Sequence, residues 1–201
     1  LRKKYLGLKN HFTYDRFLSL AHSDKKYSYD DAKELFFTSI SHTPADFQEK
    51  AREVLRDGFV DVYESDGKRS GAYSSSQADL HPFILLNYED TINSQFTTAH
   101  EMGHAMHSYL SNKNQPAIDS EYVIFVAEVA STCNEALLME HLLKTTEDKM
   151  MRKYLINYFL EQFRGTLFRQ TMFAEFEKIT HAMAEKGEPL TWEVMNKIYR
   201  D

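Results

Sequence analysis

The chain has 201 residues, of which 42% are hydrophobic and 27% are charged, enough apolar material for the core of one domain. Its formal net charge is −6, and the basic residues are scattered among acids, so we expect neither a nucleic-acid partner nor a membrane partner. The single cysteine, Cys133, excludes an internal disulfide framework and favours a reducing compartment. We therefore expect a soluble, cytoplasmic protein.

Two helices are predicted in the first third of the chain. Ser28 followed by Asp31 has the capping-box pattern that opens a helix. Thr43 precedes a proline and has an acid three residues after it, which predicts the start of a second helix. Gly58 is at the position expected for the end of that helix.

A small β element follows, and helices fill the rest of the chain. Alternating apolar and polar residues predict strands over 59–64, 72–75 and 83–88, so we expect a small antiparallel element over about residues 59–88. Helical segments are then predicted over 92–111, 119–144, 147–186 with a break at Gly165, and 191–200. The fold class we expect is mainly α.

Both ends of the sequence are unusual. The chain begins with LRKKYLG, without an initiator methionine, and it ends with NKIYRD inside a predicted helix. We therefore expect residues 1–201 to be a single region from a longer protein.

Three histidines and a glutamate lie on one predicted helix, within TTAHEMGHAMHSYL. His100 and His104 are four residues apart, so they project from one helix face and can bind a single metal ion. Glu101 can then act on a water molecule at the metal rather than on the metal itself, as in the His-Glu-x-x-His pattern of zinc hydrolases. Gly103 is a poor helix former, which indicates that a neighbouring element packs against the backbone between the histidines.

Glu128 is the candidate for the third metal ligand. It is flanked by apolar and small residues in FVAEVA, and a buried carboxylate without a partner costs several kcal/mol or becomes protonated. We therefore predict a buried Glu128 whose partner is the zinc ion, the alternative being an arginine elsewhere. A turn over residues 113–116 allows the two helices to pack antiparallel, which returns Glu128 to the level of the histidines.

Three further titratable residues lie near this pattern. Glu135 is seven residues after Glu128, on the same face, where it can accept a hydrogen bond from a metal-binding histidine. Glu121 is near the start of its helix, where a carboxylate interacts favourably with the helix dipole. His107 shares the face of His100 but lies about 10 Å further along the axis, which leaves both a role beside the site and a packing role open.

The motifs HEMGHAMHS, FVAEVASTCNEALL, GKRSGAYSS…HPFILLNY and FRQTMFAEFE together resemble the oligoendopeptidase F branch of the thimet oligopeptidase family of zinc metallopeptidases. The resemblance covers essentially the whole chain. It implies a helical bundle of the zincin type, with a deep channel that admits short peptides and excludes folded proteins. It also implies one zinc ion bound by His100, His104 and Glu128, with Glu101 as the general base.

The resemblance also carries expectations about substrate binding. It implies that the strand over 83–88 borders the cleft, where an extended peptide can pair with its edge. The family's oxyanion-stabilising segment lies beyond residue 201, so Tyr73 and His81 are the candidates for that role within this chain. Residues 77–79 stand where the family has a more glycine-rich, substrate-facing loop.

The function we predict is that of a zinc-dependent endopeptidase that hydrolyses internal bonds of short, unstructured oligopeptides with metal-activated water. Residues 1–201 would form a single catalytic region. Two alternatives remain: a zinc carboxypeptidase that carries the same motif on a helical fold, and an inactive zinc-binding structural fragment.

Overall fold

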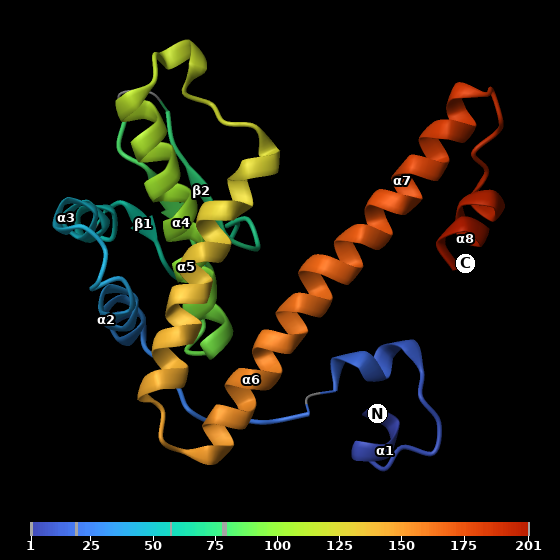
Figure 1. The fold of residues 1–201 in the computed structure, drawn as a ribbon, viewed down its shortest axis with the longest axis horizontal. Helices are drawn as coiled ribbons and strands as arrows, with labels where there is room; N and C mark the ends of the chain where they lie inside the picture. The colour runs from blue at the N-terminus through green and yellow to red at the C-terminus, as the bar shows by residue number, and fades with distance from the viewer. Residues whose placement is uncertain (1, 19, 57, 78–79, 201) are drawn as a thin grey trace. The chain divides into compact units, whose positions relative to one another are not determined.

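The computed structural model describes residues 2–18, 20–56, 58–77 and 80–200 and confirms a mainly helical chain with one small sheet (Figure 1). Its contacts form two compact units, Ser23–Lys149 and Leu1–His22 with Met150–Asp201, and each is described here by itself. The single catalytic region over 1–201 stays a prediction. In the expected substrate-facing loop, residues 78 and 79 lie outside the described residues.

The helices α2 (Tyr29–Ser39) and α3 (Ala45–Val54) open the larger unit. The capping box at the start of α2 is confirmed, because Ser28 and Asp31 exchange backbone-to-side-chain hydrogen bonds of 2.9 and 3.2 Å. The boundaries predicted for α3 were wrong. The hydroxyl of Thr43 donates a hydrogen bond to the backbone oxygen of Ile40, at the end of α2, and the N-cap of α3 is Pro44. The helix ends at Val54, before Gly58, which adopts a φ of 90° in the turn toward the sheet.

Three short strands form the sheet: β1 (Val60–Asp61), β2 (Tyr73–Ser75) and β3 (Phe83–Leu85). The order is β1-β3-β2, with β3 in the middle. The antiparallel pairing expected for this element holds for β2 and β3, whereas β1 and β3 are parallel. The chain reverses twice between β1 and β3, so these two strands run in the same direction.

The central position of β3 corrects one expectation. Ile84 pairs with Ser74 of β2 on one side and with Val60 of β1 on the other, so both edges of β3 are filled. An extended peptide therefore cannot add to Ile84 or Leu85 of the segment 83–88, because each is paired on both sides. The free edges of the sheet belong to β1 and β2, and β2 contacts the helix that follows the sheet.

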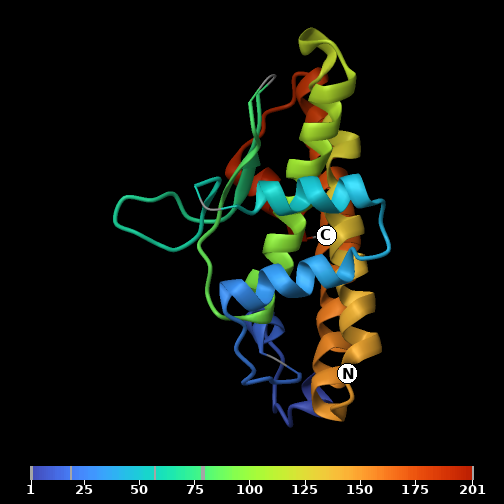
Figure 2. The ribbon, with the colours of Figure 1, turned by 90° about the vertical axis from the view of Figure 1, so that its left-hand side faces the viewer.

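Two long helices, α4 (Ile92–Asn114) and α5 (Ile124–Thr145), pack side by side in this unit (Figures 1 and 2). A Cβ atom on Gly103 would lie 2.5 Å from the Cα atom of Ser131, closer than real Cβ contacts allow. The close packing predicted from Gly103 is thus confirmed, with α5 as the neighbour. The helix expected from residue 119 begins later, because a 3-10 turn, η2 (Ala117–Asp119), precedes it.

The core of the unit holds α4 in place from several sides. α2 and α3 cross the α4–α5 pair (Figure 2), and α4 also contacts β2 and β3. The largest fully buried side chains of this core come from all of these helices, namely Phe36, Ile40, Val54, Phe96, Met102, Met106 and Leu138. The close packing of these side chains fixes the position of α4 along its axis and its rotation about that axis.

Replacing Tyr88 by Phe is expected to lower the free energy of unfolding by about 1–2 kcal/mol. The buried Tyr88 hydroxyl donates to the carbonyl oxygen of Tyr27 at 2.8 Å and ties the end of the sheet to the start of α2. Burial also raises the pKa of this phenol. Urea denaturation measures the change, with Tyr63→Phe at an exposed tyrosine as the control. Equal stability of the two variants would show that the hydrogen bond contributes nothing.

The smaller unit is built around one long helical segment. Helices α6 (Lys149–Phe163) and α7 (Arg169–Glu185) are continuous through the π-helical turn η3 (Arg164–Phe168). The break predicted at Gly165 is therefore a change of helix type within a continuous segment. The remaining elements of this unit are α1 (Arg2–Tyr5), η1 (Thr13–Phe17) and α8 (Trp192–Arg200).

Specific contacts attach the short helices of this unit to the long one. Phe176 of α7 meets Tyr199 of α8 edge to face, with ring centroids 5.6 Å apart. Arg2 of α1 forms an ion pair of 2.9 Å with Glu161 of α6. Among the described residues, no helix has the length and apolarity needed to cross a membrane.

Candidate active site

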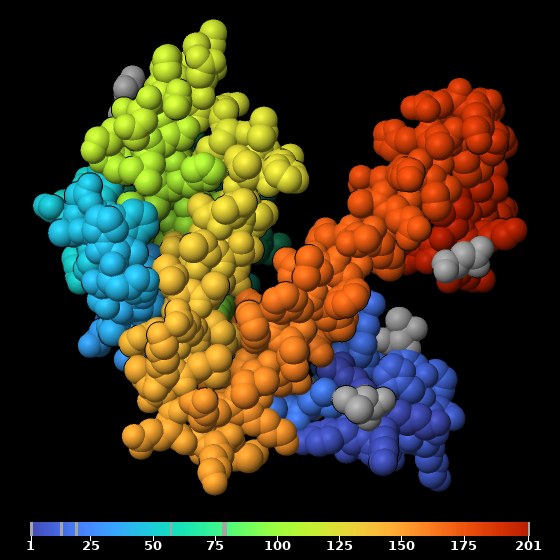
Figure 3. Space-filling view, in the orientation of Figure 1, coloured from blue at the N-terminus to red at the C-terminus, as the bar shows by residue number. Residues whose placement is uncertain are grey.

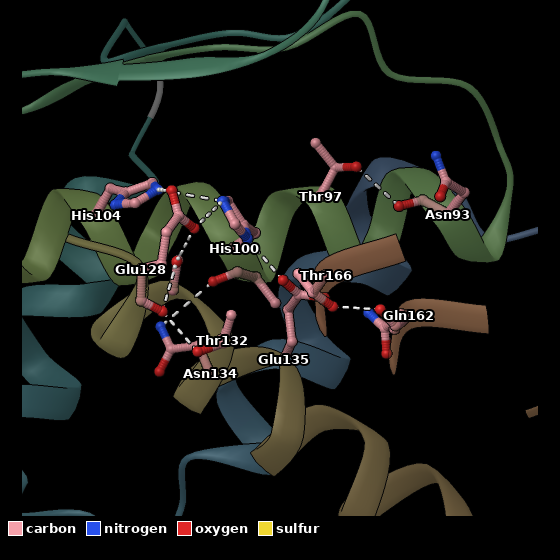
Figure 4. Close-up of polar contacts among 12 residues, drawn as sticks. Asn93, Thr97, His100, His104, Glu128, Thr132, Asn134, Glu135, Gln162 and Thr166 are labelled. Carbon is pink, nitrogen blue, oxygen red and sulfur yellow. Dashed lines mark hydrogen bonds and ion pairs between the residues drawn. The ribbon is translucent and has the colours of Figure 1, made fainter. Parts of the chain in front are cut away.

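The two histidines of the motif come together on one face of α4 (Figure 4). The Nε2 atoms of His100 and His104 lie 3.1 Å apart, and the rings are inclined at 80°. Both side chains are only partly buried, so neither ring is closed off from solvent. The spacing of four residues therefore brings the two rings together on one helix face, as helix geometry predicts.

Glu128 of α5 reaches the same point from the neighbouring helix (Figure 4). Its Oε2 lies 3.4 Å from His100 Nε2, and its Oε1 lies 3.7 Å from His104 Nε2. Its side chain is 61% exposed, so the predicted burial of Glu128 was wrong. The apolar residues around it belong to a surface segment at the start of α5, visible in yellow in Figure 3, where Phe125 is 88% exposed.

The spacing of these three side chains suits one zinc ion. Zinc binds histidine nitrogen and carboxylate oxygen at about 2.0–2.2 Å in a tetrahedral arrangement, which separates the ligand atoms by about 3.3–3.5 Å. The two histidine nitrogens lie 3.1 Å apart, and each has one oxygen of Glu128 nearby, Oε2 at 3.4 Å from His100 and Oε1 at 3.7 Å from His104. With one ligand atom taken from each residue, all three atoms lie within 4.8 Å of one another. Within the described part of the chain, these three residues form the group whose ligand atoms lie close enough to hold a metal ion.

Glu135 lies behind His100, on the side away from the group of ligand atoms. Its Oε1 is 2.6 Å from His100 Nδ1, which places the ring proton on Nδ1 and leaves the Nε2 lone pair facing Glu128. Burial lowers the pKa of His100, but the hydrogen bond and charge of Glu135 outweigh it, so the pKa is raised. Glu135 therefore orients the ring and increases its basicity.

Glu101 is close to the ligand atoms without being one of them. It is 6% exposed, and burial raises the pKa of its carboxyl group. The charge of Glu128 adds to this rise in pKa, whereas His100 and the backbone N–H of Ser74, on the free edge of β2, oppose it. The arrangement produces a carboxylate that holds a proton more readily than an ordinary glutamate, which suits a general base.

The remaining predicted residues are not among the three whose ligand atoms converge. His107 stacks on Tyr122, with ring centroids 3.7 Å apart, and burial lowers the pKa of His107. His81 stacks on Phe59 at 3.6 Å, which places it in the packing of the sheet. Tyr73 is exposed on β2, beside the Ser74 backbone that faces Glu101.

Two contributions to the site were missed by the sequence analysis. The backbone N–H of Ser74 carries no signal in the sequence, since any residue there except proline would supply it. Ser131 also contacts Glu128, through a hydrogen bond of 2.9 Å to the carboxylate. The signal for it was available: a hydroxyl three residues after a glutamate on a helix lies on the same face.

The profile described as Peptidase family M3 matches residues 8–201, so the chain belongs to peptidase family M3. The sequence is similar to Oligopeptidase PepF of Bacillus subtilis (strain 168), with 46% identity over 202 residues that cover 100% of this chain and 30% of the relative. It is also similar to an Oligoendopeptidase F homolog of Lactococcus lactis subsp. lactis (strain IL1403), with 42% identity over 99% of this chain and 33% of the relative.

A solved structure supports the same assignment. A crystal structure described as a "putative peptidase from Chlamydophila abortus" superimposes with a TM-score of 0.80 at 42% identity, covering 99% of this chain and 33% of that one. The resemblance to oligoendopeptidase F is thus confirmed. The chain spans about a third of the length of the curated relatives it matches.

Proposed function

We propose that the chain carries the catalytic zinc site of an endopeptidase that cleaves internal bonds of short, unstructured oligopeptides. One observation carries the proposal: two histidine nitrogens of α4 and the Glu128 carboxylate of α5 converge closely enough to hold one metal ion, and the buried Glu101 follows the first of these histidines. The relatives' names, oligopeptidase and oligoendopeptidase, support peptides as substrates. Cys133 is an exposed free thiol, which supports a cytoplasmic location.

His100, His104 and Glu128 would hold the ion, and Glu135 would keep the His100 ring in the orientation for binding. A zinc ion bound there supplies Lewis acidity, which polarises a peptide carbonyl and makes water more acidic. Glu101 takes the proton of the attacking water molecule. Because burial raises the pKa of Glu101, it retains that proton long enough to deliver it to the departing amine nitrogen.

The edge of β2 would orient the peptide. Ser74 pairs with Ile84 of the central strand, but its own N–H faces Glu101 on the free side of β2. An extended substrate lying along that edge passes the general base and the metal ligands. Backbone hydrogen bonds of this kind bind peptides with little regard to side chains.

Product analysis tests this function against its main rival. The purified chain with added zinc is incubated with an unstructured, internally quenched peptide of about ten residues, and the products are identified by mass spectrometry. We expect one N-terminal and one C-terminal fragment from cleavage at an internal bond, loss of cleavage on removal of zinc with a chelator, and recovery when zinc is restored. Release of single residues from the C-terminus would instead establish a carboxypeptidase.

The third reading, a structural zinc-binding fragment, is distinguished in the same samples. It predicts stoichiometric zinc binding without any product. That outcome would mean that segments present in the longer relatives are required for turnover, and that the chain holds the metal without the means to bind a peptide.

A further inference from the structure

The hydroxyl of Ser131 lies inside the contact between α4 and α5 and faces the carboxylate of Glu128. Ser131 is 0% exposed, whereas the Glu128 side chain is 61% exposed. Ser131 Oγ lies 2.9 Å from Glu128 Oε2 and 3.1 Å from the backbone oxygen of the same residue. A fully buried donor is thus placed against an exposed acceptor that lies within 3.4 Å of a histidine nitrogen.

The hydroxyl has one proton, and two oxygens of Glu128 are within its reach. The backbone oxygen of Glu128 already accepts a hydrogen bond of 2.5 Å from Thr132. The carboxylate is charged as well as closer to Ser131 Oγ, and hydrogen bonds to charged acceptors are about twice as strong as neutral ones. The proton of Ser131 therefore goes to the carboxylate.

The Glu128 side chain needs a hydrogen-bond donor to fix its orientation, because it is exposed and little else packs around it. A glutamate side chain has up to about 2 kcal/mol of rotamer freedom, and an exposed one keeps most of it. Apart from the two histidine rings, Ser131 is the side chain that bonds to this carboxylate within the described residues. Without the hydrogen bond from Ser131, binding of a metal ion would have to fix the orientation of the Glu128 side chain at an entropic cost.

Ser131 can orient its neighbour because it is itself immobile. Its Cα atom lies where a side chain at Gly103 would otherwise stand, so the backbones of α4 and α5 fix its position. A serine side chain has a single rotatable carbon–carbon bond, and full burial restricts it further. We propose that Ser131 is a positioning residue that holds the Glu128 carboxylate ready for the metal ion; this inference rests on the zinc site proposed above.

Two neighbouring variants test the inference. Ser131→Ala removes the bond to the carboxylate, whereas Thr132→Val removes a bond to the backbone oxygen of the same residue and leaves the carboxylate untouched. Zinc affinity is measured by competition with a chromogenic chelator. We expect Ser131→Ala to bind zinc about 10-fold more weakly, within the range known for residues that orient metal ligands, and Thr132→Val to match the parent within about 2-fold.

A second readout separates positioning from a general structural effect. The visible absorption of the cobalt-substituted chain reports the geometry around the metal, and we expect it to change in Ser131→Ala but not in Thr132→Val. Urea denaturation of the metal-free variants measures any loss of stability separately from the loss of zinc affinity. The inference would be overturned if Ser131→Ala left the zinc affinity and the cobalt spectrum unchanged. It would also be overturned if both variants changed them equally. Failure of the parent itself to bind zinc would instead overturn the proposed metal site.

Discussion

Gly103→Ala is expected to lower the free energy of unfolding by about 2 kcal/mol. The new Cβ atom would stand 2.5 Å from Ser131 Cα and 2.6 Å from the backbone oxygen of Ala130, and neither backbone atom can move without moving α5. Overpacking of this kind costs up to about 3 kcal/mol, and the better helix propensity of alanine returns about 1 kcal/mol. Zinc affinity should fall as well, because Glu128 moves with α5.

The measurements are urea denaturation and zinc competition, with Gly165→Ala as the matched control. Gly165 is also helical, but apart from its chain neighbours and the backbone of its own helix, no atom lies within 4 Å of the position that its Cβ would take. Alanine there should leave zinc affinity unchanged and stability unchanged or slightly increased. If Gly103→Ala behaves in the same way, the two helices have room to separate and their contact does not set the ligand geometry.

Glu101→Gln is expected to reduce the rate of peptide cleavage by about 10²–10⁴-fold. Glutamine has the same shape but cannot accept the proton of the attacking water molecule. Glu101 is not among the three residues whose ligand atoms converge, so zinc affinity should stay within about 3-fold of the parent. The combination of intact metal binding and lost turnover is the signature of a missing base.

Glu121→Gln is the control for the same change of charge. Glu121 is exposed and lies before the start of α5, outside the group of ligand atoms. This variant should cleave at the parent's rate. Cleavage by Glu101→Gln at a comparable rate would remove Glu101 from the proposed mechanism, and a loss of zinc would make it a ligand instead.

Local patterns in the sequence predicted the parts of the structure that depend on neighbours along the chain. The capping box at Ser28, the face shared by His100 and His104, and the close approach at Gly103 all follow from helix geometry and one or two side chains. They were predicted because the competing conformations are few at such positions.

Other features depend on partners far away in the chain, and these were missed or wrong. The order of the sheet places β3 between the other two strands, which no local alternation of residues could reveal. The exposure of Glu128 reversed the prediction of a buried acid, since apolar neighbours in sequence do not say whether a segment lies in the core or at the surface. The role of His81 at the oxyanion stays a prediction, and its stacking on Phe59 was likewise not foreseen from the sequence.

The exposed position of Glu128 bears on how the proposed metal ion would be acquired. Many small zinc domains fold only around their ion, because the metal supplies the energy that their core lacks. Here the α4–α5 contact is packed by buried side chains such as Met102 and Leu138, while one ligand stands at the surface. A zinc ion bound as proposed would therefore load onto a folded chain and exchange through the side of Glu128, and its occupancy would follow the free zinc concentration rather than the history of folding.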